Sequence, residues 1–170
     1  MLNQTLLPRQ QASIPLDDRS FRYGDAVFDT LRVSNGTPYR LAFHMNRLTQ
    51  GLAATRIPFD TTQLPPLIRA IIAQNHTHEG LVRIHISRGS GGRGYLPDSA
   101  APPLLLIETH ARPTLPAGAV DLMMSSYTKP DLSALPVSAK TAQGLNSTLA
   151  RLEAQDSGFF DAVLCNSKHE

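Results

Sequence analysis

Apolar and polar residues alternate along several short stretches of the chain, which is the pattern of strands with one buried face. In LVRIHIS, for example, Val82, Ile84 and Ile86 share one face of the strand. Asn35-Gly36 follows the first such stretch and is a strong signal for a two-residue hairpin turn. The alternation predicts strands at 26–33, 37–43, 81–87, 103–110, 120–127 and 159–166.

Apolar residues that recur three and four positions apart predict amphipathic helices at 42–56, 61–75 and 141–156. The clearest stripe is formed by Leu64, Leu67, Ile68, Ile71 and Ile72. The stripe of the last helix is formed by Leu145, Leu149 and Leu152. Strands and helices in this order predict an α+β fold.

A proline-rich stretch divides the chain into two expected domains. ARPTLPAG carries two prolines and a glycine and is typical of a linker. We expect an N-terminal α+β domain at 1–112, a linker at 113–118 and the start of a second domain at 119–170. About fifty residues are too few for most independently stable domains. We therefore expect the second domain to be truncated.

The bulk composition narrows the function classes. The formal net charge of +2 is too small to indicate a nucleic-acid partner, and no apolar run approaches the length of a membrane span. We also expect no signal peptide. Cys165 is the one cysteine, which excludes an intrachain disulfide, fits a cytoplasmic location and is expected as a buried strand thiol. The six histidines lack zinc-binding spacings, so we expect no metal.

The stretch ISRGSGGRGYLP, residues 86–97, carries four glycines and two arginines between two predicted strands. A dinucleotide-binding loop must lead into a helix, and the prolines that follow argue against one. A single copy in a near-neutral chain also argues against an RGG-type RNA-binding segment. Arg88 or Arg93 could offer a planar guanidinium to a carboxylate. By composition alone, a glycine hairpin with solvated arginines is the simpler interpretation.

Three segments together resemble fold-type IV pyridoxal 5'-phosphate (PLP) enzymes, the class IV aminotransferase family. DDRSFRYGDAVFDTLRVSNG at 17–36 is similar to the family's N-terminal pattern, and HMNRL at 44–48 is similar to its H-x-x-R-L. AKTAQGLNSTLARLEA at 139–154 is similar to its K-x-x-N-x-L-N-x-x-L-A segment. The loop SRGSGGRGY at 87–95 resembles that of the aminodeoxychorismate lyase branch. The family also holds branched-chain and D-amino-acid aminotransferases.

The resemblance implies a two-domain class IV fold, with a complete N-terminal α/β sandwich and a truncated, barrel-like C-terminal domain. It implies PLP as the cofactor, a small-molecule amino substrate and a homodimer. It assigns the catalytic, cofactor-bound amine to Lys140 and the cofactor phosphate to Arg47. It assigns substrate contacts to Phe28, Arg93 and Tyr95.

Without the resemblance, Lys140 would be an exposed lysine at a helix start and Arg47 a surface arginine. The small, uncharged neighbours of Lys140 predict burial, which would favour its neutral amine. His44 and Arg47 are three positions apart, so both can point at one site. Phe28 would otherwise be a core aromatic residue of a strand.

The match departs from the family in ways that leave the activity open. Gln143 replaces the usual Asn and Asp29 the usual Glu, and the glutamate that binds the pyridine nitrogen is expected beyond residue 170. We therefore expect the chain to be inactive alone. The glycine loop favours a lyase that releases pyruvate and 4-aminobenzoate for folate synthesis, whereas Asn146 is more typical of an aminotransferase. A third possibility is a non-catalytic fragment that keeps the fold.

Overall fold

The computed structural model describes residues 1–98, 100–136, 138–168 and 170, and their packing forms two compact units. The first unit contains Met1–Arg112 together with Ser138–Ala142, and the second contains Pro113–Val137 and Gln143–Glu170. Lys140 thus packs in the first unit, although the sequence division assigned its segment to the second domain. The division at 112 and 118 stays a prediction.

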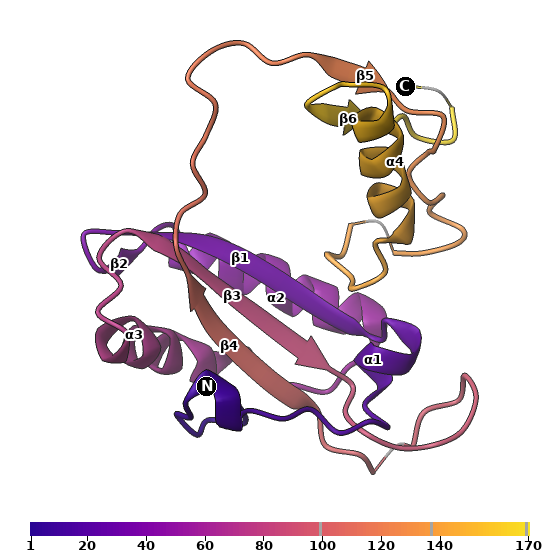
Figure 1. The fold of residues 1–170 in the computed structure, drawn as a ribbon. Coiled ribbons are helices and arrows are strands. Elements are labelled where there is room, and N and C mark those ends of the chain that lie inside the picture. The colour runs from indigo at the N-terminus through magenta and orange to yellow at the C-terminus, as the bar shows by residue number, and fades with distance from the viewer. Residues whose placement is uncertain (99, 137, 169) are drawn as a thin grey trace. The chain divides into compact units, whose positions relative to one another are not determined.

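The first unit is built on a four-stranded antiparallel sheet in the order β2-β1-β3-β4 (Figure 1). Its strands are β1 (Ala26–Ser34), β2 (Thr37–Pro38), β3 (Gly80–Ser87) and β4 (Leu104–His110). Its helices are η1 (Arg9–Gln11), α1 (Arg19–Tyr23), α2 (Leu41–Thr55), η2 (Thr61–Gln63) and α3 (Leu64–Gln74). The strands predicted at 26–33, 81–87 and 103–110 and both long helices of this unit are therefore found, while α1 was missed.

Helices α2 and α3 cover one face of the sheet and enclose the core (Figure 1). Val82, Ile84 and Ile86 all point into this core and are fully buried, as their alternation predicts. Leu64, Ile68, Ile71 and Ile72 of α3 supply the opposite wall. The other face of the sheet carries the residues between these positions, among them Phe28, Arg83 and His85.

The strand predicted at 37–43 is wrong beyond its first two residues. Asn35 and Gly36 both have positive φ, 49° and 69°, and form the predicted tight turn. Arg40 then adopts a left-handed conformation with φ 50°, which turns the chain directly into α2 at Leu41. The apolar residues of this stretch therefore belong to the first turn of a helix.

Helix α1 was missed because it has only five residues and no apolar stripe. Asp18 caps it by accepting a hydrogen bond from the backbone of Ser20 at 2.8 Å. Gly24, with φ 65°, ends it. These local signals place Tyr23 and Asp25 immediately before β1.

The second unit pairs β5 (Leu122–Met124) in parallel with β6 (Asp161–Val163), and α4 (Leu145–Asp156) connects them. Both strands are shorter than predicted, and Cys165 lies beyond β6, half-buried. The predicted leucine stripe of α4 is wrong, because Leu145 and Leu152 are exposed. Two short strands offer little surface, and α4 buries the small residues Ala150 and Ala154 instead.

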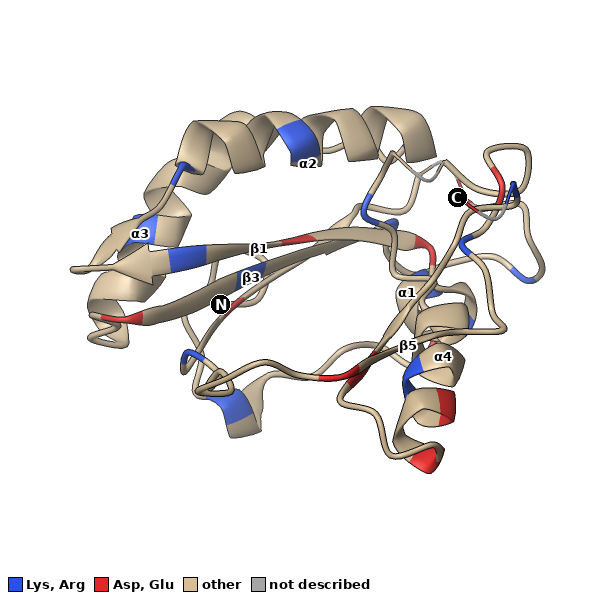
Figure 2. Cartoon of the chain, turned by 90° about the horizontal axis from the view of Figure 1, so that it is seen from above, with Lys and Arg blue, Asp and Glu red and all other residues tan. Residues whose placement is uncertain are grey.

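Charges of both signs are spread over the strands and helices, without a continuous basic stripe along any element (Figure 2). Within the described ranges, no helix combines the length and apolar character needed to cross a membrane. The same residues contain no group of three or more His, Cys, Asp and Glu side chains arranged to hold a metal. His169 lies outside the described residues.

Candidate active site

Lys140 lies alongside the start of β1. Its carbonyl accepts a hydrogen bond from the backbone N–H of Phe28 at 2.9 Å, and Ala142 donates to the carbonyl of Ala26 at the same distance. Thr141 forms an antiparallel bridge with Val27. Backbone pairing thus fixes the lysine beside this strand.

The amino group of Lys140 lies over the ring of Phe28, with Nζ 4.7 Å from the ring centroid. The guanidinium of Arg83 lies over the same ring, with Cζ at 4.2 Å. Phe28 therefore orients two cations through its electron-rich faces. The strand register explains the arrangement, because Arg83 pairs with Thr30, two residues along β1 on the same face as Phe28.

Arg83 also lines a pocket of about 350 Å³ on the open face of the sheet, together with His85 and Glu108. Apolar side chains from the N-terminal segment, Ile14, Leu16 and Phe21, line the same pocket. Burial, followed by the charge of Arg83, lowers the pKa of His85 below its ordinary value, so His85 is neutral near pH 7. No motif in the sequence marks Arg83 as a site residue, although its alternation with Val82 and Ile84 places it on this face.

The predicted convergence of His44 and Arg47 is confirmed, and the group they share is Asp29. The carboxylate of Asp29 is 1% exposed and accepts hydrogen bonds from Nε and Nη2 of Arg47 at 2.9 and 2.6 Å. Nδ1 of His44 lies 3.0 Å from the same carboxylate. The side chain of Arg47 remains 37% exposed. The guanidinium is thus held by a buried acid while part of it faces solvent.

Arg47 and Lys140 approach β1 from different sides. Phe28 and Asp29 are consecutive in the strand, so their side chains point to opposite faces of the sheet. The amino group of Lys140 lies over the Phe28 face, whereas Arg47 lies on the α2 face. The edge of β1 is therefore the element that both predicted cofactor residues share.

Arg93 and Tyr95 lie at the tip of the glycine loop. Both are exposed, and the side chain of Tyr95 stacks at a tilt on Tyr23, with ring centroids 5.7 Å apart. No hydrogen bond, ion pair or ring contact among the described residues joins either side chain to Lys140, Phe28 or Arg47. The structure thus brings Lys140 and Phe28 together and leaves the loop residues apart from them.

The two arginines of the loop differ in their surroundings. Arg88 binds Asp25 through Nε and Nη2, at 2.8 and 3.0 Å, and also donates to the carbonyls of Thr55 and Arg56. Arg93 is exposed at the tip. Of the two arginines that the sequence offered, Arg93 is therefore the one available to a ligand.

The predicted burial of Lys140 is wrong for this chain, because its side chain is exposed. The strand pairing holds its backbone through the carbonyl, while Phe28 covers one side of the amino group. Small, uncharged neighbours in the sequence therefore do not produce burial here.

The side chains present fit PLP by their chemistry. Lys140 offers an amine that no ion pair within the described ranges neutralises. Arg47 offers a partly exposed guanidinium, the group best matched to a phosphate. Phe28 offers a flat apolar surface next to the amine. β1 and its neighbours therefore supply an amine, an anion-binding guanidinium and an aromatic surface.

The first unit is thus an antiparallel sheet covered by two helices, with a lysine amine fixed at the edge of β1. Residues 26–170 match the family described as "Amino-transferase class IV", and the chain belongs to this family. The prediction of this family, of its α+β fold and of an enzyme is confirmed.

Relatives named for different activities have similar sequence identities to this chain. An aminodeoxychorismate lyase of Vibrio harveyi is 31% identical over 160 residues, covering 92% of this chain and 58% of its own. A D-alanine aminotransferase of Listeria monocytogenes is 26% identical over 170 residues, again covering 58% of its own length. The chain thus spans less than two thirds of the curated relatives it matches.

Solved structures support the same fold. The 4-amino-4-deoxychorismate lyase of Pseudomonas aeruginosa superposes with a TM-score of 0.82 at 29% identity, covering 99% of this chain and 61% of that one. The branched-chain amino acid aminotransferase of Escherichia coli superposes with a TM-score of 0.91 at 23% identity, covering 98% and 59%. The second likeness shows the fold alone.

Asp29 is expected to contribute stability that is lost in acid. Burial alone would raise the pKa of Asp29, but the hydrogen bonds from Arg47 and His44 outweigh it and hold the pKa below its ordinary value. A carboxylate with a depressed pKa stabilises the fold above its unfolded pKa, and this contribution disappears as pH falls through the folded pKa. We expect Asp29→Asn to lower the free energy of unfolding at pH 7 by about 2 kcal/mol, discounted for the exposure of Arg47.

Urea unfolding of the wild type and of Asp29→Asn at pH 7 and at pH 3 measures this difference. The gap between the two proteins should shrink at pH 3. A gap that is equal at both pH values would show that the charge of Asp29 contributes nothing.

Proposed function

We propose that this chain is the N-terminal part of a PLP-dependent enzyme, a 4-amino-4-deoxychorismate lyase that releases pyruvate and 4-aminobenzoate. The observation that carries the proposal is the amine of Lys140 fixed over Phe28 beside a second cation, Arg83. The likeness to two lyases of that type, at 31% and 29% identity, favours the lyase. The 26% identity to a D-alanine aminotransferase makes an aminotransferase the second candidate.

In this proposal each side chain has a distinct task. Lys140 is the catalytic residue and binds the cofactor aldehyde, and Arg47 binds the cofactor phosphate. Bound PLP supplies an aldehyde and an electron-withdrawing ring. Phe28, Arg93 and Tyr95 contact the substrate.

The amino group of Lys140 acts as general base and acid. Its Nζ takes a proton from a ring carbon of the substrate, the C–O bond between the ring and the enolpyruvyl group breaks, and enolpyruvate leaves. Return of the proton from Nζ to the methylene carbon of enolpyruvate gives pyruvate. The remaining ring becomes aromatic, which drives the reaction. Arg83 lies next to Phe28 with a guanidinium suited to a substrate carboxylate, so it orients the substrate toward Nζ.

A homodimer in the cytoplasm is part of the proposal. Large apolar side chains are exposed on the first unit, including Leu16 at 80% and Phe21 at 73%. Exposed apolar surface of this kind is typical of an interaction site. Light scattering of the complete protein, encoded by the whole reading frame, measures the oligomeric state.

Two assays on the complete protein with PLP separate the candidates. We expect pyruvate and 4-aminobenzoate to appear in equal amounts from 4-amino-4-deoxychorismate. Exchange of an amino group between a D- or branched-chain amino acid and a 2-keto acid, without pyruvate release, would instead identify an aminotransferase. Neither activity, in a folded protein, would favour a non-catalytic protein that keeps the fold.

Borohydride reduction of the protein with PLP tests the cofactor assignment separately. A pyridoxyl group should be found by mass spectrometry on the peptide that contains Lys140. A label on Lys129 or Lys168, or on no lysine of a folded protein, would contradict the assignment.

A further inference from the structure

The tip of the glycine loop is held by a buried arginine from α1. The side chain of Arg19 is 3% exposed, and its Nη1 and Nη2 donate to the carbonyls of Gly94 and Tyr95 at 3.1 and 3.0 Å. Both terminal nitrogens of the guanidinium therefore donate hydrogen bonds to two consecutive backbone carbonyls of the tip. A buried arginine fork that binds loop backbone fixes the position of that loop.

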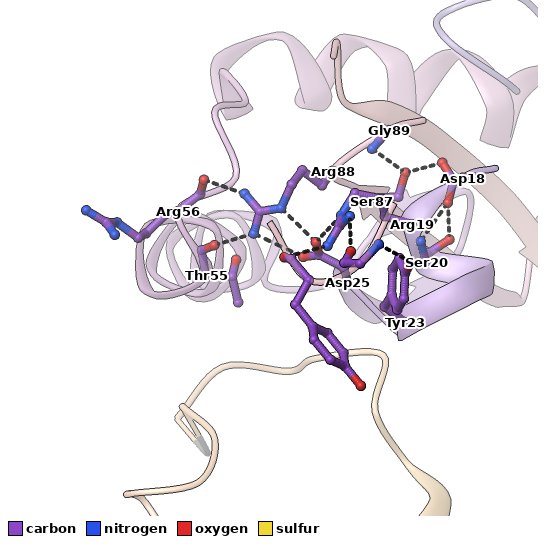
Figure 3. A network of polar contacts seen from close by, with 12 residues as sticks. Asp18, Arg19, Ser20, Tyr23, Asp25, Thr55, Arg56, Ser87, Arg88 and Gly89 are labelled. Atoms are coloured by element: carbon purple, nitrogen blue, oxygen red, sulfur yellow. Dashed lines mark hydrogen bonds and ion pairs between the residues drawn. The ribbon is translucent and has the colours of Figure 1, made fainter. Parts of the chain in front are cut away.

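Asp25 fixes this arginine in turn (Figure 3). Its carboxylate accepts Nε of Arg19 at 2.9 Å and Nε of Arg88 at 2.8 Å. Burial alone would raise the pKa of Asp25, but the hydrogen bonds and charges of Arg88 and Arg19 outweigh it and lower the pKa. Arg88 is tied to the last turn of α2 through the carbonyls of Thr55 and Arg56. The chain of contacts therefore runs from the core helix to the loop tip.

The base of the loop is tied to the same short segment. Ser87 donates its hydroxyl to the buried carboxylate of Asp18 at 2.6 Å and accepts from the N–H of Gly89 at 3.0 Å. A Cβ on Gly89 would lie 2.0 Å from the carbonyl oxygen of Pro102, so only glycine fits there. Figure 3 shows this second set of contacts beside the first.

Tyr23 adds a weaker attachment at the tip. Its hydroxyl accepts a hydrogen bond from the N–H of Gly94 at 3.1 Å, and Cζ of Arg19 lies 4.6 Å from the centroid of its ring. Gly94 itself has φ 78°, a conformation that suits glycine. The backbone of the tip is thus fixed on both its N–H and carbonyl sides.

The side chains of the same tip face solvent, apart from the tilted contact of the Tyr95 ring with Tyr23. Arg93 is exposed, and Tyr95 is 89% exposed. Simple closure of a hairpin requires no buried arginine. A fixed backbone that carries exposed polar side chains is typical of a preorganised contact surface. Because the loop is already ordered, ligand binding does not have to overcome the entropic cost of ordering it.

We propose that Arg19 and Asp25 are positioning residues, which hold the loop tip so that Arg93 and Tyr95 are presented to the substrate. This inference rests on the proposed function, in which those two side chains contact the substrate. Neither Arg19 nor Asp25 touches the reacting atoms. Their removal should therefore weaken substrate binding and leave the proton transfer at Lys140 intact.

Arg19→Lys in the complete protein with PLP tests the proposal, because lysine keeps the charge and loses the fork. Arg22→Lys is the matched control, since Arg22 lies on the same short helix, is exposed and donates its Nε to the carbonyl of Leu16, away from the loop tip. Tyr23→Phe, which deletes one hydroxyl, serves as a second variant if Arg19→Lys does not fold. Circular dichroism establishes folding of each variant.

Two readouts follow the loop and the reaction separately. Trypsin cleaves after exposed arginines, so the rate at which the fragment beginning at Gly94 appears reports the mobility of the tip. We expect Arg19→Lys to accelerate this cleavage about tenfold, and Tyr23→Phe by less. We expect KM for the substrate to rise about tenfold while kcat changes by less than about twofold. Arg22→Lys should match the wild type in both.

Three results would overturn the proposal. Equal rates of cleavage and equal KM values in Arg19→Lys and Arg22→Lys would show that Arg19 does not fix the loop tip. Faster cleavage with an unchanged KM would show that Arg19 anchors the loop without positioning a substrate contact. A wild type without a pyridoxyl label on Lys140 would remove the proposed function, and the positioning role with it, whatever trypsin shows.

Discussion

Lys140→Ala in the complete protein is expected to abolish turnover. Among the described residues of the first unit, Lys140 supplies the only amine beside Phe28, and the substitution removes it. Alanine offers neither a nucleophile nor a group that can carry a proton. Removal of a group that acts as both nucleophile and general base typically costs a factor of at least about 10³ in kcat. The backbone pairing of residue 140 with Phe28 should survive, since it uses the lysine carbonyl only. Folding should therefore change little.

Lys129→Ala is the matched control for this prediction. Lys129 is near Lys140 in the sequence but belongs to the second unit. There its backbone N–H donates to the carbonyl of Cys165, which belongs to the same unit. Steady-state turnover of both variants, with circular dichroism as the test of folding, distinguishes a catalytic role from a general loss of structure. Equal activity of Lys140→Ala and the wild type would end the proposed mechanism.

Local patterns were enough to predict the sheet of the first unit and its two long helices. Val82, Ile84 and Ile86 alternate strictly, and all three are fully buried. The strand at 37–43 failed because a left-handed residue, Arg40, redirected the chain, and no alternation pattern encodes such a turn. The leucine stripe of α4 failed because burial depends on the surface available to pack against.

The site was predictable only where a motif supplied long-range information. Lys140 was assigned by the resemblance of its segment, and the convergence of His44 and Arg47 by helical spacing. The acid that joins the last two, Asp29, lies 18 positions from Arg47 on a different element. The contacts that fix the loop tip join Arg19 to Tyr95, which lies 76 positions further along the chain. Packing of α2 on β1 brings the first pair together, and the register of β1 and β3 brings the loop that follows β3 beside the helix that precedes β1.

The same register explains why two arginines in one loop differ so much. Arg88 follows β3 directly, and its backbone N–H donates to the carbonyl of Asp25, which places its side chain against that carboxylate. Arg93 lies five residues further, beyond three glycines and at the free tip. Composition does not distinguish the two arginines. Their distances from the end of the paired strand β3 do, because the nearer one is held against Asp25 and the farther one faces solvent.

Arg47→Ala is expected to weaken binding of the cofactor through its phosphate. Hydrogen bonds to charged groups contribute about 1.5–3 kcal/mol each, so loss of the guanidinium should raise the Kd for PLP about 30-fold or more. The variant also removes the guanidinium from the buried carboxylate of Asp29 and leaves His44 as its side-chain partner, which destabilises the fold independently of the cofactor. Affinity for PLP alone cannot separate these two effects.

Pyridoxal, which has the same aldehyde and ring without the phosphate, separates them. If Arg47 binds the phosphate, Arg47→Ala should raise the Kd for PLP about 30-fold while the Kd for pyridoxal changes little. A purely structural loss would weaken both ligands by the same factor, because it disturbs the site whatever the ligand carries. Arg69→Ala, at an exposed position of α3, is the control and should alter neither Kd. The ratio of the two dissociation constants therefore decides between an anion-binding guanidinium and one that only neutralises Asp29.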